Sequence, residues 1–206
     1  MDMTETPLHS TSLYKGRIVS LRVDEVRLPN GVSARREVVD HPGGICIAPL
    51  TEAGDLLFVR QFRYPYGGVL LELPAGKLTP GEDPLAAGKR ELLEKTGAVA
   101  ERYHSLGLVY PSPGYCGEII HLFAARVSSR HAPQPDEDEF LDCVAIPLES
   151  AAQMVMNGEI YDAKTQIAIL ELRSLCAEGG FKSEELRYSE NNPLRGIVCI
   201  FRISML

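Results

Sequence analysis

The sequence predicts an α+β fold in which a mixed β-sheet is sandwiched between helices and an antiparallel β-hairpin extends from the N-terminal side. Three observations support this fold class. Strand-like segments occur both before and after a helical segment in the middle of the chain, which favours a mixed sheet with flanking helices. The turn sequence Pro29-Asn30-Gly31 separates two strand-like segments near the N-terminus. The 206 residues are 45% hydrophobic and 24% charged, which is sufficient for one globular unit with an appendage.

Alternating apolar and polar residues place the first strands. The hairpin strands are expected at Tyr14–Leu28 and Val32–Val39, after a first dozen residues that we interpret as a loose tail. The alternation slips before Val26, which indicates a β-bulge. Gly43–Leu50 and Asp55–Arg63 form a second predicted strand pair.

The mid-chain helix has clear signals at both ends. A short strand, Val69–Leu73, precedes a loop over Ala75–Glu82 that is rich in glycine and proline. The helix then begins near Asp83. Pro84 stands at a tolerated first-turn position, and Gly97 is the residue expected to adopt the left-handed conformation that closes a helix.

The remaining elements follow from the second half of the chain. The predicted strands and helices are His104–Tyr110, Ile119–Arg126, Phe140–Pro147, Glu149–Met156 and Asp162–Ala177. The last of these is a helix with Asp162 as its expected N-cap and with Ala168, Leu172 and Leu175 on its buried stripe. We divide the chain into a tail and hairpin (1–42), a main domain (43–178) and a C-terminal tail that the pattern does not place (179–206).

Composition argues against several classes of protein. The 28 Asp and Glu outnumber the 21 Lys and Arg, and the net charge of −7 argues against a dedicated nucleic-acid binder. No apolar run approaches the roughly 20 residues that a membrane-spanning helix needs, and the first residues lack a secretory pattern. The five cysteines are odd in number and widely spread, which favours reduced thiols over a disulfide framework or a zinc site. We therefore expect a cytoplasmic protein with no nucleic-acid or membrane partner.

The segment from Gly76 to Ala98 carries the chemistry. On a helix, Glu91, Glu94 and Lys95 stand at i, i+3 and i+4 on one face. A loop rich in glycine and proline at the foot of such a helix suits magnesium, which takes a few carboxylate and carbonyl oxygens and leaves positions for substrate phosphates. Taken alone, the helix face has another interpretation, a solvated surface stabilised by i,i+4 ion pairs.

The whole segment resembles the signature of the Nudix hydrolases, G-x5-E-x7-R-E-hydrophobic-x-E-E-x-G-hydrophobic. The matching positions are Gly76, Glu82, Arg90, Glu91, Leu92, Glu94, Gly97 and Ala98. The resemblance implies a Nudix hydrolase domain within residues 43–178, with Mg²⁺ or Mn²⁺ as the cofactor. It also implies that Glu91 and Glu94 hold the metal. The site would be supported structurally by Gly76, Glu82, Arg90 and Gly97.

Lys95 departs from this signature, which has a glutamate at that position. In the resembling enzymes that glutamate is usually a principal metal ligand, whereas a protonated lysine cannot coordinate magnesium. Its ammonium could instead pair with Glu91 and Glu94 and partly replace the cation. We therefore expect weakened metal affinity and a lower rate, down to no turnover. The alternative is that Glu94 and a carboxylate from outside the signature still hold enough metal.

Further residues resemble the ADP-ribose pyrophosphatase branch of the family. The resemblance implies that Arg63 contacts the substrate diphosphate, that Glu72 is a site residue and that the Ala75 carbonyl binds metal. Arg63 also has a structural interpretation, an ion pair with Glu72. Pro113 stands 15 positions after Ala98, an offset typical of ADP-ribose hydrolases, although loop prolines are common.

Two more candidates lie outside the signature. Arg36, on the predicted hairpin, matches an arginine that in relatives reaches a substrate across a dimer interface, and it is equally interpretable as a solvated strand residue. The acidic run 136–139 is by default a solvated loop. In this branch, however, a glutamate there helps to activate water, and Glu139 is the best match, with Glu137 second.

The resemblance thus implies Mg²⁺-dependent hydrolysis of the diphosphate bond of ADP-ribose to AMP and ribose 5-phosphate by a homodimer. The small-molecule partner would be a compound linked through a nucleoside diphosphate. Its adenine would need a flat apolar or aromatic slot, for which the candidates are Tyr14, Phe62, Tyr64 and Tyr66. Two alternatives stay open. One is the hydrolysis of another nucleoside diphosphate-linked compound; the other is a catalytically impaired domain, motivated by Lys95, that binds a nucleotide.

Overall fold

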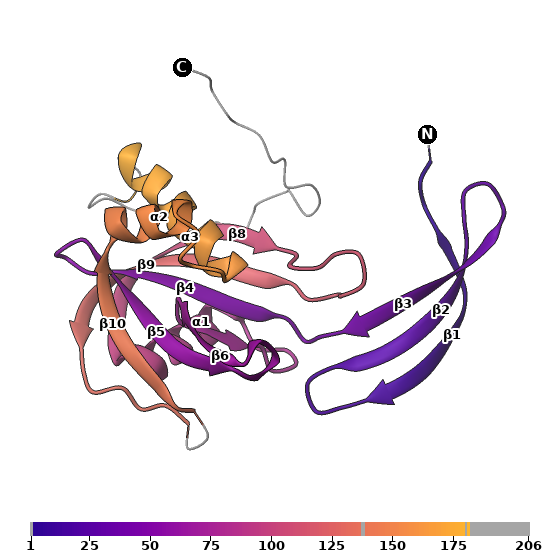
Figure 1. The fold of residues 1–206 in the computed structure, drawn as a ribbon, viewed down its shortest axis with the longest axis horizontal. Helices are drawn as coiled ribbons and strands as arrows, with labels where there is room; N and C mark the ends of the chain where they lie inside the picture. The colour runs from indigo at the N-terminus through magenta and orange to yellow at the C-terminus, as the bar shows by residue number, and fades with distance from the viewer. Residues whose placement is uncertain (1, 137–138, 180, 182–206) are drawn as a thin grey trace.

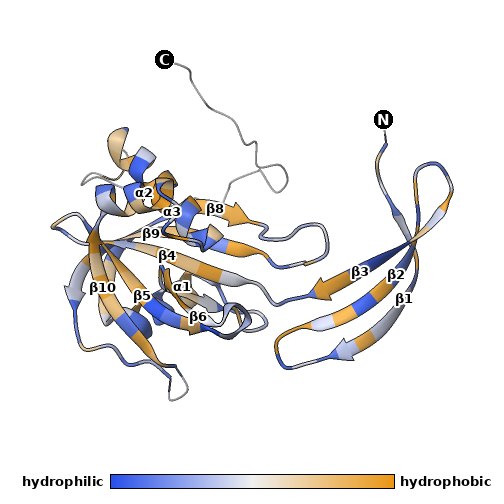
Figure 2. Cartoon of the chain, viewed as in Figure 1, coloured by the Kyte–Doolittle hydropathy of each residue, from blue (hydrophilic) through white to orange (hydrophobic). Residues whose placement is uncertain are grey.

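A three-stranded sheet stands beside a larger layered domain (Figure 1). The structure, a computed structural model, describes residues 2–136, 139–179 and 181. The N-terminal sheet is antiparallel, with strands β1 (Thr6–Lys15), β2 (Ser20–Arg27) and β3 (Ser33–Asp40) in that order. Hydrophobic and hydrophilic residues both occur along these strands, and their alternation is clearest along β2 (Figure 2), as expected for a sheet whose faces differ. The predicted hairpin of β2 and β3 is present.

The predicted loose tail is wrong, because residues 6–15 form strand β1. The predicted single strand Tyr14–Leu28 is instead two strands joined by a turn in which Gly16 N donates to Val19 O. Pairing along β2 and β3 is continuous. The predicted irregularity near Val26 belongs to β1, whose register against β2 shifts there and again further on. These shifts interrupt the alternation that would otherwise mark residues 6–15 as a strand.

The larger sheet is mixed, with strand order β10-β5-β4-β9-β8. Strands β4 (Gly44–Leu50) and β9 (Ile120–Arg130) run parallel. Strands β5 (Asp55–Arg63), β8 (Ala98–Val109) and β10 (Leu141–Pro147) each pair antiparallel with a neighbour. The mixed sheet that the sequence predicts is confirmed.

Helix α1 (Pro84–Thr96) covers one face of this sheet. A Cβ at Gly88 would lie 2.6 Å from Ile47 Cδ1, so the glycine lets the helix approach β4 closely. Asp83 caps the helix by accepting a first-turn backbone hydrogen bond of 2.8 Å, and Gly97 closes it with a φ of 68°. Both predicted helix ends are therefore confirmed. This packing fixes the height of α1 above the sheet.

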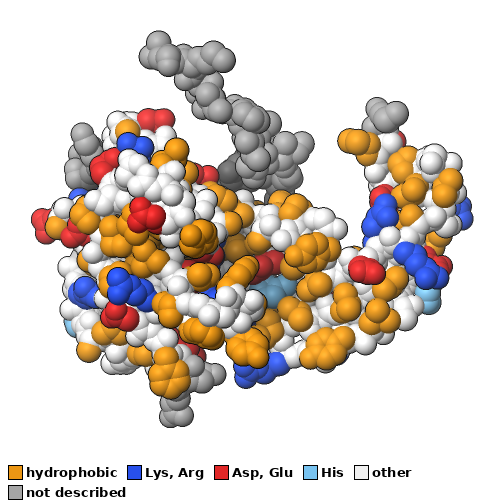
Figure 3. Space-filling model, viewed as in Figure 1, with side chains coloured by type: hydrophobic (Ala, Val, Ile, Leu, Met, Phe, Trp, Pro, Cys, Tyr) orange, Lys and Arg blue, Asp and Glu red, His pale blue; other side chains and the backbone are white. Residues whose placement is uncertain are grey.

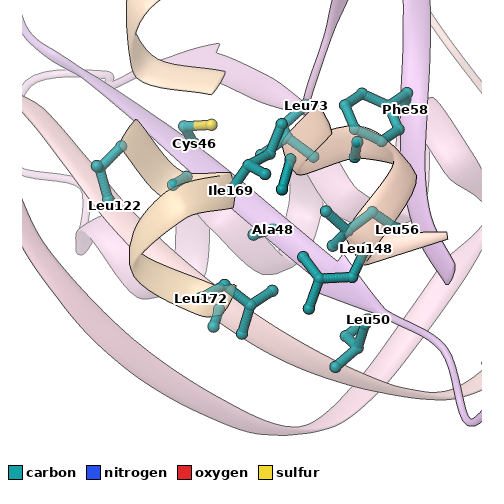
Figure 4. Close-up of a cluster of buried hydrophobic side chains, with 14 of the residues drawn as sticks. Cys46, Ala48, Leu50, Leu56, Phe58, Leu73, Leu122, Leu148, Ile169 and Leu172 are labelled. Carbon is teal, nitrogen blue, oxygen red and sulfur yellow. The ribbon is translucent and has the colours of Figure 1, made fainter. Parts of the chain in front are cut away.

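Helices α2 (Leu148–Met156) and α3 (Ala163–Ala177) cover the opposite face. Alternate residues of β4 supply both cores, so that the strand is buried along its whole length. Figure 4 shows side chains of the core beneath α2 and α3, among them Cys46, Ala48, Leu50, Leu56, Phe58, Leu148, Ile169 and Leu172. The predicted arrangement of a sheet between helices is confirmed. Across the described residues, no helix combines the length and apolar character needed to cross a membrane.

Two short strands complete the sheet around the candidate site. Strand β6 (Gly68–Glu72) pairs with β5, and β7 (Ala75–Lys77) pairs with β4. We predicted Ala75–Glu82 as loop throughout, so its first three residues are a correction. Strand β8 likewise begins at Ala98, directly after α1, rather than at His104, because register shifts near its start break the alternating pattern.

The N-terminal sheet is tied to the larger domain at the end of β3. Val39 N donates to Tyr115 O over 2.8 Å, and Gly117 N donates to Val39 O over 2.9 Å. Both partners belong to the loop between β8 and β9 that contains Pro113. The proposed C-terminal tail, 179–206, lies outside the described residues except for Gly179 and Phe181.

Candidate active site

Glu91 on α1 is packed directly against the backbone of β7. Only 8% of Glu91 is exposed. A Cβ built on Gly76 would lie 2.0 Å from the carboxyl carbon of Glu91, far inside van der Waals contact. A residue without a side chain is therefore required at the first position of the signature. The close packing of α1 on the sheet brings the helix carboxylate next to the strand that carries Ala75.

Arg90, on α1, forms ion pairs with three carboxylates, one from the loop before the helix and two from the helix itself. Its Nη1 donates to Glu91 Oε1 over 2.9 Å and to Glu94 Oε2 over 3.0 Å. Its Nε donates to Glu82 Oε1 over 3.3 Å. Burial opposes the charge of the guanidinium, but the three carboxylates outweigh burial and raise the pKa of Arg90. Glu82 also accepts hydrogen bonds from the backbone and hydroxyl of Thr79, so the loop before α1 is braced against the helix.

Lys95 is the second cation of the cluster, and its side chain is only 3% exposed. Its Nζ lies 3.8 Å from Glu91 Oε2 and donates a hydrogen bond to Glu139. The expected pairing with Glu91 is therefore present. The expected pairing with Glu94 is wrong: within the described chain, Glu94 binds Arg90 and Glu139 occupies the second place beside Lys95. Burial raises the pKa of Glu91, an effect that Lys95 and Arg90 offset only in part.

Glu139 reaches this cluster from the segment that precedes β10. Its backbone N donates to Asp136 O over 2.9 Å, and its carboxylate contacts α1 through Lys95. Glu137, the second candidate, lies outside the described residues. Lys95 thus connects Glu139 to Glu91, although these two residues are 48 positions apart in the sequence.

Arg63 and Glu72 form a separate ionic group at the ends of β5 and β6. Arg63 donates from Nε and Nη2 to the two carboxylate oxygens of Glu72 over 2.6 and 2.8 Å. Lys164 Nζ also donates to Glu72, over 2.8 Å, and to Asp162 over 2.7 Å. Burial would raise the pKa of Glu72, but hydrogen bonds and charges from Arg63 and Lys164 outweigh it and lower the pKa from 4.5 to about 2. The structural interpretation of Arg63 is therefore observed, and the ion pair fixes its guanidinium fork.

Lys164 and Thr165 are the residues of this region whose contacts sequence reasoning missed. Thr165 is fully buried, and its Oγ1 accepts a 2.9 Å hydrogen bond from Leu73 N. Both contacts join the start of α3 to the end of β6 across a separation of 92 residues. The spacing of neighbouring residues in the sequence cannot predict contacts over such a separation. The signal that was available is the polar run Lys164, Thr165 and Gln166 in the first turn after the expected cap Asp162.

Arg36 and Pro113 do not join the carboxylate cluster of α1 in this chain. Arg36 donates from Nε and Nη2 to Glu5 over 2.9 and 2.6 Å, within the N-terminal sheet. Pro113 is exposed in the loop between β8 and β9. The four candidates for stacking on a base are all exposed, namely Tyr14, Phe62, Tyr64 and Tyr66.

The donor set around α1 is of the kind that a hard divalent cation takes, because it consists of carboxylates beside the backbone of Ala75 and Gly76. As arranged, no three His, Cys, Asp or Glu side chains of the described residues converge on one metal position. The carboxylates face Arg90 and Lys95 instead. The cluster therefore fits a divalent cation by the chemistry of its carboxylates, which here pair with Arg90 and Lys95.

Comparison with known proteins agrees with the fold and the signature. Residues 40–165 match the family described as NUDIX domain, and residues 5–39 match the nucleoside diphosphate sugar hydrolase N-terminal domain. The chain therefore belongs to the Nudix hydrolase family.

Relatives of known name cover most of the chain. The ADP-ribose pyrophosphatase of Bacillus subtilis (strain 168) is 38% identical over 83% of this chain and 94% of its own length. The methanol dehydrogenase activator of Bacillus methanolicus is 40% identical over 82% of this chain and 92% of its own. Among solved structures, an ADP compounds hydrolase superimposes with a TM-score of 0.76 at 21% identity, covering 87% of this chain and 99% of that one. The predicted membership of the family and its fold are confirmed.

Proposed function

We propose that this Nudix hydrolase cleaves the diphosphate bond of ADP-ribose to AMP and ribose 5-phosphate, with Mg²⁺ or Mn²⁺ as cofactor. The observation that carries the proposal is the ionic cluster of α1 beside β7, in which Arg90 pairs with Glu91 and Glu94 and Lys95 pairs with Glu91 and Glu139. The similarity to an ADP-ribose pyrophosphatase over 83% of the chain supports the choice of substrate. The free cysteines of the described residues suit a cytoplasmic location for this reaction.

Glu91, Glu94 and the Ala75 carbonyl would hold the divalent cation. When bound, it would neutralise charge on the diphosphate and help a water molecule to lose its proton. Glu82 and Arg90 support this arrangement by joining the loop to the helix. Gly76 leaves the space that Glu91 occupies, and Gly97 closes α1.

Glu139 would serve as the acceptor of the proton from the attacking water, at a carboxylate oxygen. The water oxygen then forms a bond to one phosphorus of the diphosphate, and the bond from that phosphorus to the bridging oxygen breaks. One phosphate leaves with the nucleoside and the other with the ribose, which accounts for all atoms of the substrate and of one water. Lys95 holds Glu139 beside Glu91 during this exchange.

Arg63 would bind the diphosphate through the edge of its guanidinium. Two of its donors already bind Glu72, so Glu72 and Lys164 fix the direction of the fork. The exposed aromatic residues Tyr64 and Tyr66 follow Arg63 directly in the chain and are candidates for contact with the adenine. Pro113 would border the same substrate.

The active form would be a homodimer that uses the N-terminal sheet of β1, β2 and β3, which falls within the first segment of our division, residues 1–42. Hydrophobic side chains lie across the visible face of this sheet (Figure 3). The exposed apolar residues of the sheet and its turns include Leu8, Leu13, Tyr14, Ile18, Val19 and Val32. A three-stranded sheet with so much exposed apolar surface gains stability from a second surface. A second copy would cover it, and Arg36 would then reach the partner's substrate.

Lys95 favours a second candidate function, a Nudix domain that binds a nucleotide without efficient turnover. The N-terminal match to nucleoside diphosphate sugar hydrolases favours a third, the hydrolysis of such a sugar. The discriminating experiment measures nucleoside monophosphate release from ADP-ribose and from a nucleoside diphosphate sugar, with Mg²⁺, by the native chain and by Lys95→Glu. Native release of AMP from ADP-ribose supports the first function. Release only by the variant supports the binding module, and native cleavage of the sugar compound alone contradicts our choice of substrate.

A further inference from the structure

The carboxylate cluster of α1 contains its own counter-ions. Its four carboxylates belong to Glu82, Glu91, Glu94 and Glu139, and its two cations are Arg90 and Lys95. All of them are joined through the contacts of these two cations. With every group ionised, the cluster carries a charge of −2, which is the charge that one divalent cation neutralises.

The two cations hold different places. Arg90 lies partly exposed at the outer edge, where it binds Glu82, Glu91 and Glu94. Lys95 is nearly fully buried, and its ammonium stands between Glu91 and Glu139. A buried cation in contact with two carboxylates is in the position where a metal ion would otherwise be needed, because buried carboxylates require a counter-charge.

We propose that the Lys95 ammonium is a resident cation that takes the place of one divalent metal ion. The site then binds one ion fewer than the same cluster would with a glutamate at position 95. Such a glutamate would change the charge of the cluster by two units, from −2 to −4, and would add a ligand. This inference rests on the proposed use of a divalent cation. It adds a statement of how many such ions the site binds.

A consequence concerns Glu139. Without Lys95, the like charges of Glu139 and Glu91 would repel each other unless another cation stood between them. Here Lys95 holds Glu139 beside Glu91 without an ion. In the native chain, the proposed proton acceptor Glu139 is therefore in position before the substrate binds.

The test counts Mn²⁺ ions bound per chain by equilibrium dialysis of the full chain without substrate. Lys95→Glu is expected to bind one ion more than the native chain. The matched control is Lys89→Glu, which makes the same change of charge on the same helix. Lys89 is exposed and lies 5.2 Å from the centre of the Tyr103 ring, so this variant is expected to bind as many ions as the native chain.

A second variant keeps the inference testable if Lys95→Glu does not fold. Lys95→Gln removes the positive charge without adding a carboxylate, and it is expected to tighten Mn²⁺ binding by about tenfold or more. Equal ion counts for native and Lys95→Glu, or equal affinities for native and Lys95→Gln, would overturn the inference. Turnover of ADP-ribose is measured separately. Its absence, together with the expected ion counts, would contradict the proposed substrate and leave the resident cation standing.

Discussion

At Gly76, the space that a side chain would fill is occupied by the carboxyl group of Glu91. Arg90 and Lys95 then bind that carboxylate from two sides. One backbone position and three side chains therefore determine where the acidic face of α1 meets the sheet. Single substitutions at these positions should therefore change the stability or the activity of the protein.

Gly76→Ala is expected to displace Glu91, because the new Cβ would lie 2.0 Å from its carboxyl carbon. We expect a loss of about 1–3 kcal/mol in the free energy of unfolding and a fall of at least about tenfold in the rate of AMP release. Urea denaturation and a steady-state assay measure the two effects. The matched control is Gly114→Ala, because Gly114 has open space and no positive φ. Equal stability and activity for both variants would show that Glu91 is not held by β7.

The ionic group of Glu72 predicts a defined dependence of stability on pH. The pKa of Glu72 is lowered from 4.5 to about 2 in the folded chain, so its stabilising contribution is complete above pH 4.5. As the pH falls from 4.5 toward 2, the unfolded chain takes up the proton first, and the contribution is lost. Glu72→Gln is therefore expected to unfold more easily than the native chain at neutral pH, by the order of 2 kcal/mol, with the difference shrinking across that window. Urea denaturation of both chains at several pH values measures it. A difference that stays constant would contradict the ion pair.

Residues on one helix were the easiest to predict. Arg90, Glu91 and Glu94 lie on α1, and Glu82 lies two residues before its start, so short-range geometry brings them together. Lys164 and Glu72 meet only because the start of α3 docks on the end of β6, 92 residues away. The sequence carries no local trace of that docking. The same holds for the choice of Glu139 rather than Glu94 as the partner of Lys95.

At the scale of whole elements, regular segments were predicted well and irregular ones poorly. Helix α1 has a cap, a first-turn proline and a closing glycine, and its ends agree with the structure. Strand β1 and the start of β8 contain register shifts, which break the two-residue period on which strand prediction depends. Strand β7 has only three residues and forms because β4 offers it a partner.

The docking of α3 on β6 can be tested through Thr165. Thr165→Val preserves the shape of the side chain but removes the oxygen that accepts from Leu73 N. A buried donor is then left without its partner, and we expect a loss of about 1–3 kcal/mol in the free energy of unfolding. Thr165→Ser keeps the hydroxyl and is expected to retain most of the stability, apart from the loss of a methyl group. Thermal or urea denaturation separates the two. A serine variant as unstable as the valine variant would show that packing, rather than the hydrogen bond, matters at this position.

At the scale of the whole molecule, the N-terminal sheet is joined to the layered domain through Val39 and the loop between β8 and β9. This sheet exposes apolar side chains that the proposed second copy would cover. The assembly we propose makes Leu13→Asp disruptive, because this apolar residue of β1 is 60% exposed. We expect the variant to be a monomer by light scattering coupled to gel filtration.

The control for that experiment is Met156→Asp, which places the same charge at an exposed apolar residue at the end of α2. It is expected to remain a dimer. A native chain that is already a monomer at micromolar concentration would contradict the proposed assembly, without bearing on the carboxylate cluster.

If the carboxylates of α1 serve the cleavage of a diphosphate, the reaction should depend strongly on Glu91. The measurement is the rate of AMP formation from ADP-ribose with saturating Mg²⁺, for the native chain and for Glu91→Gln, with Glu52→Gln in an exposed turn as control. We expect the native chain and the control to release AMP and ribose 5-phosphate, and Glu91→Gln to be slower by about 100-fold or more. Equal rates for native and Glu91→Gln, or no AMP from the native chain, would contradict it.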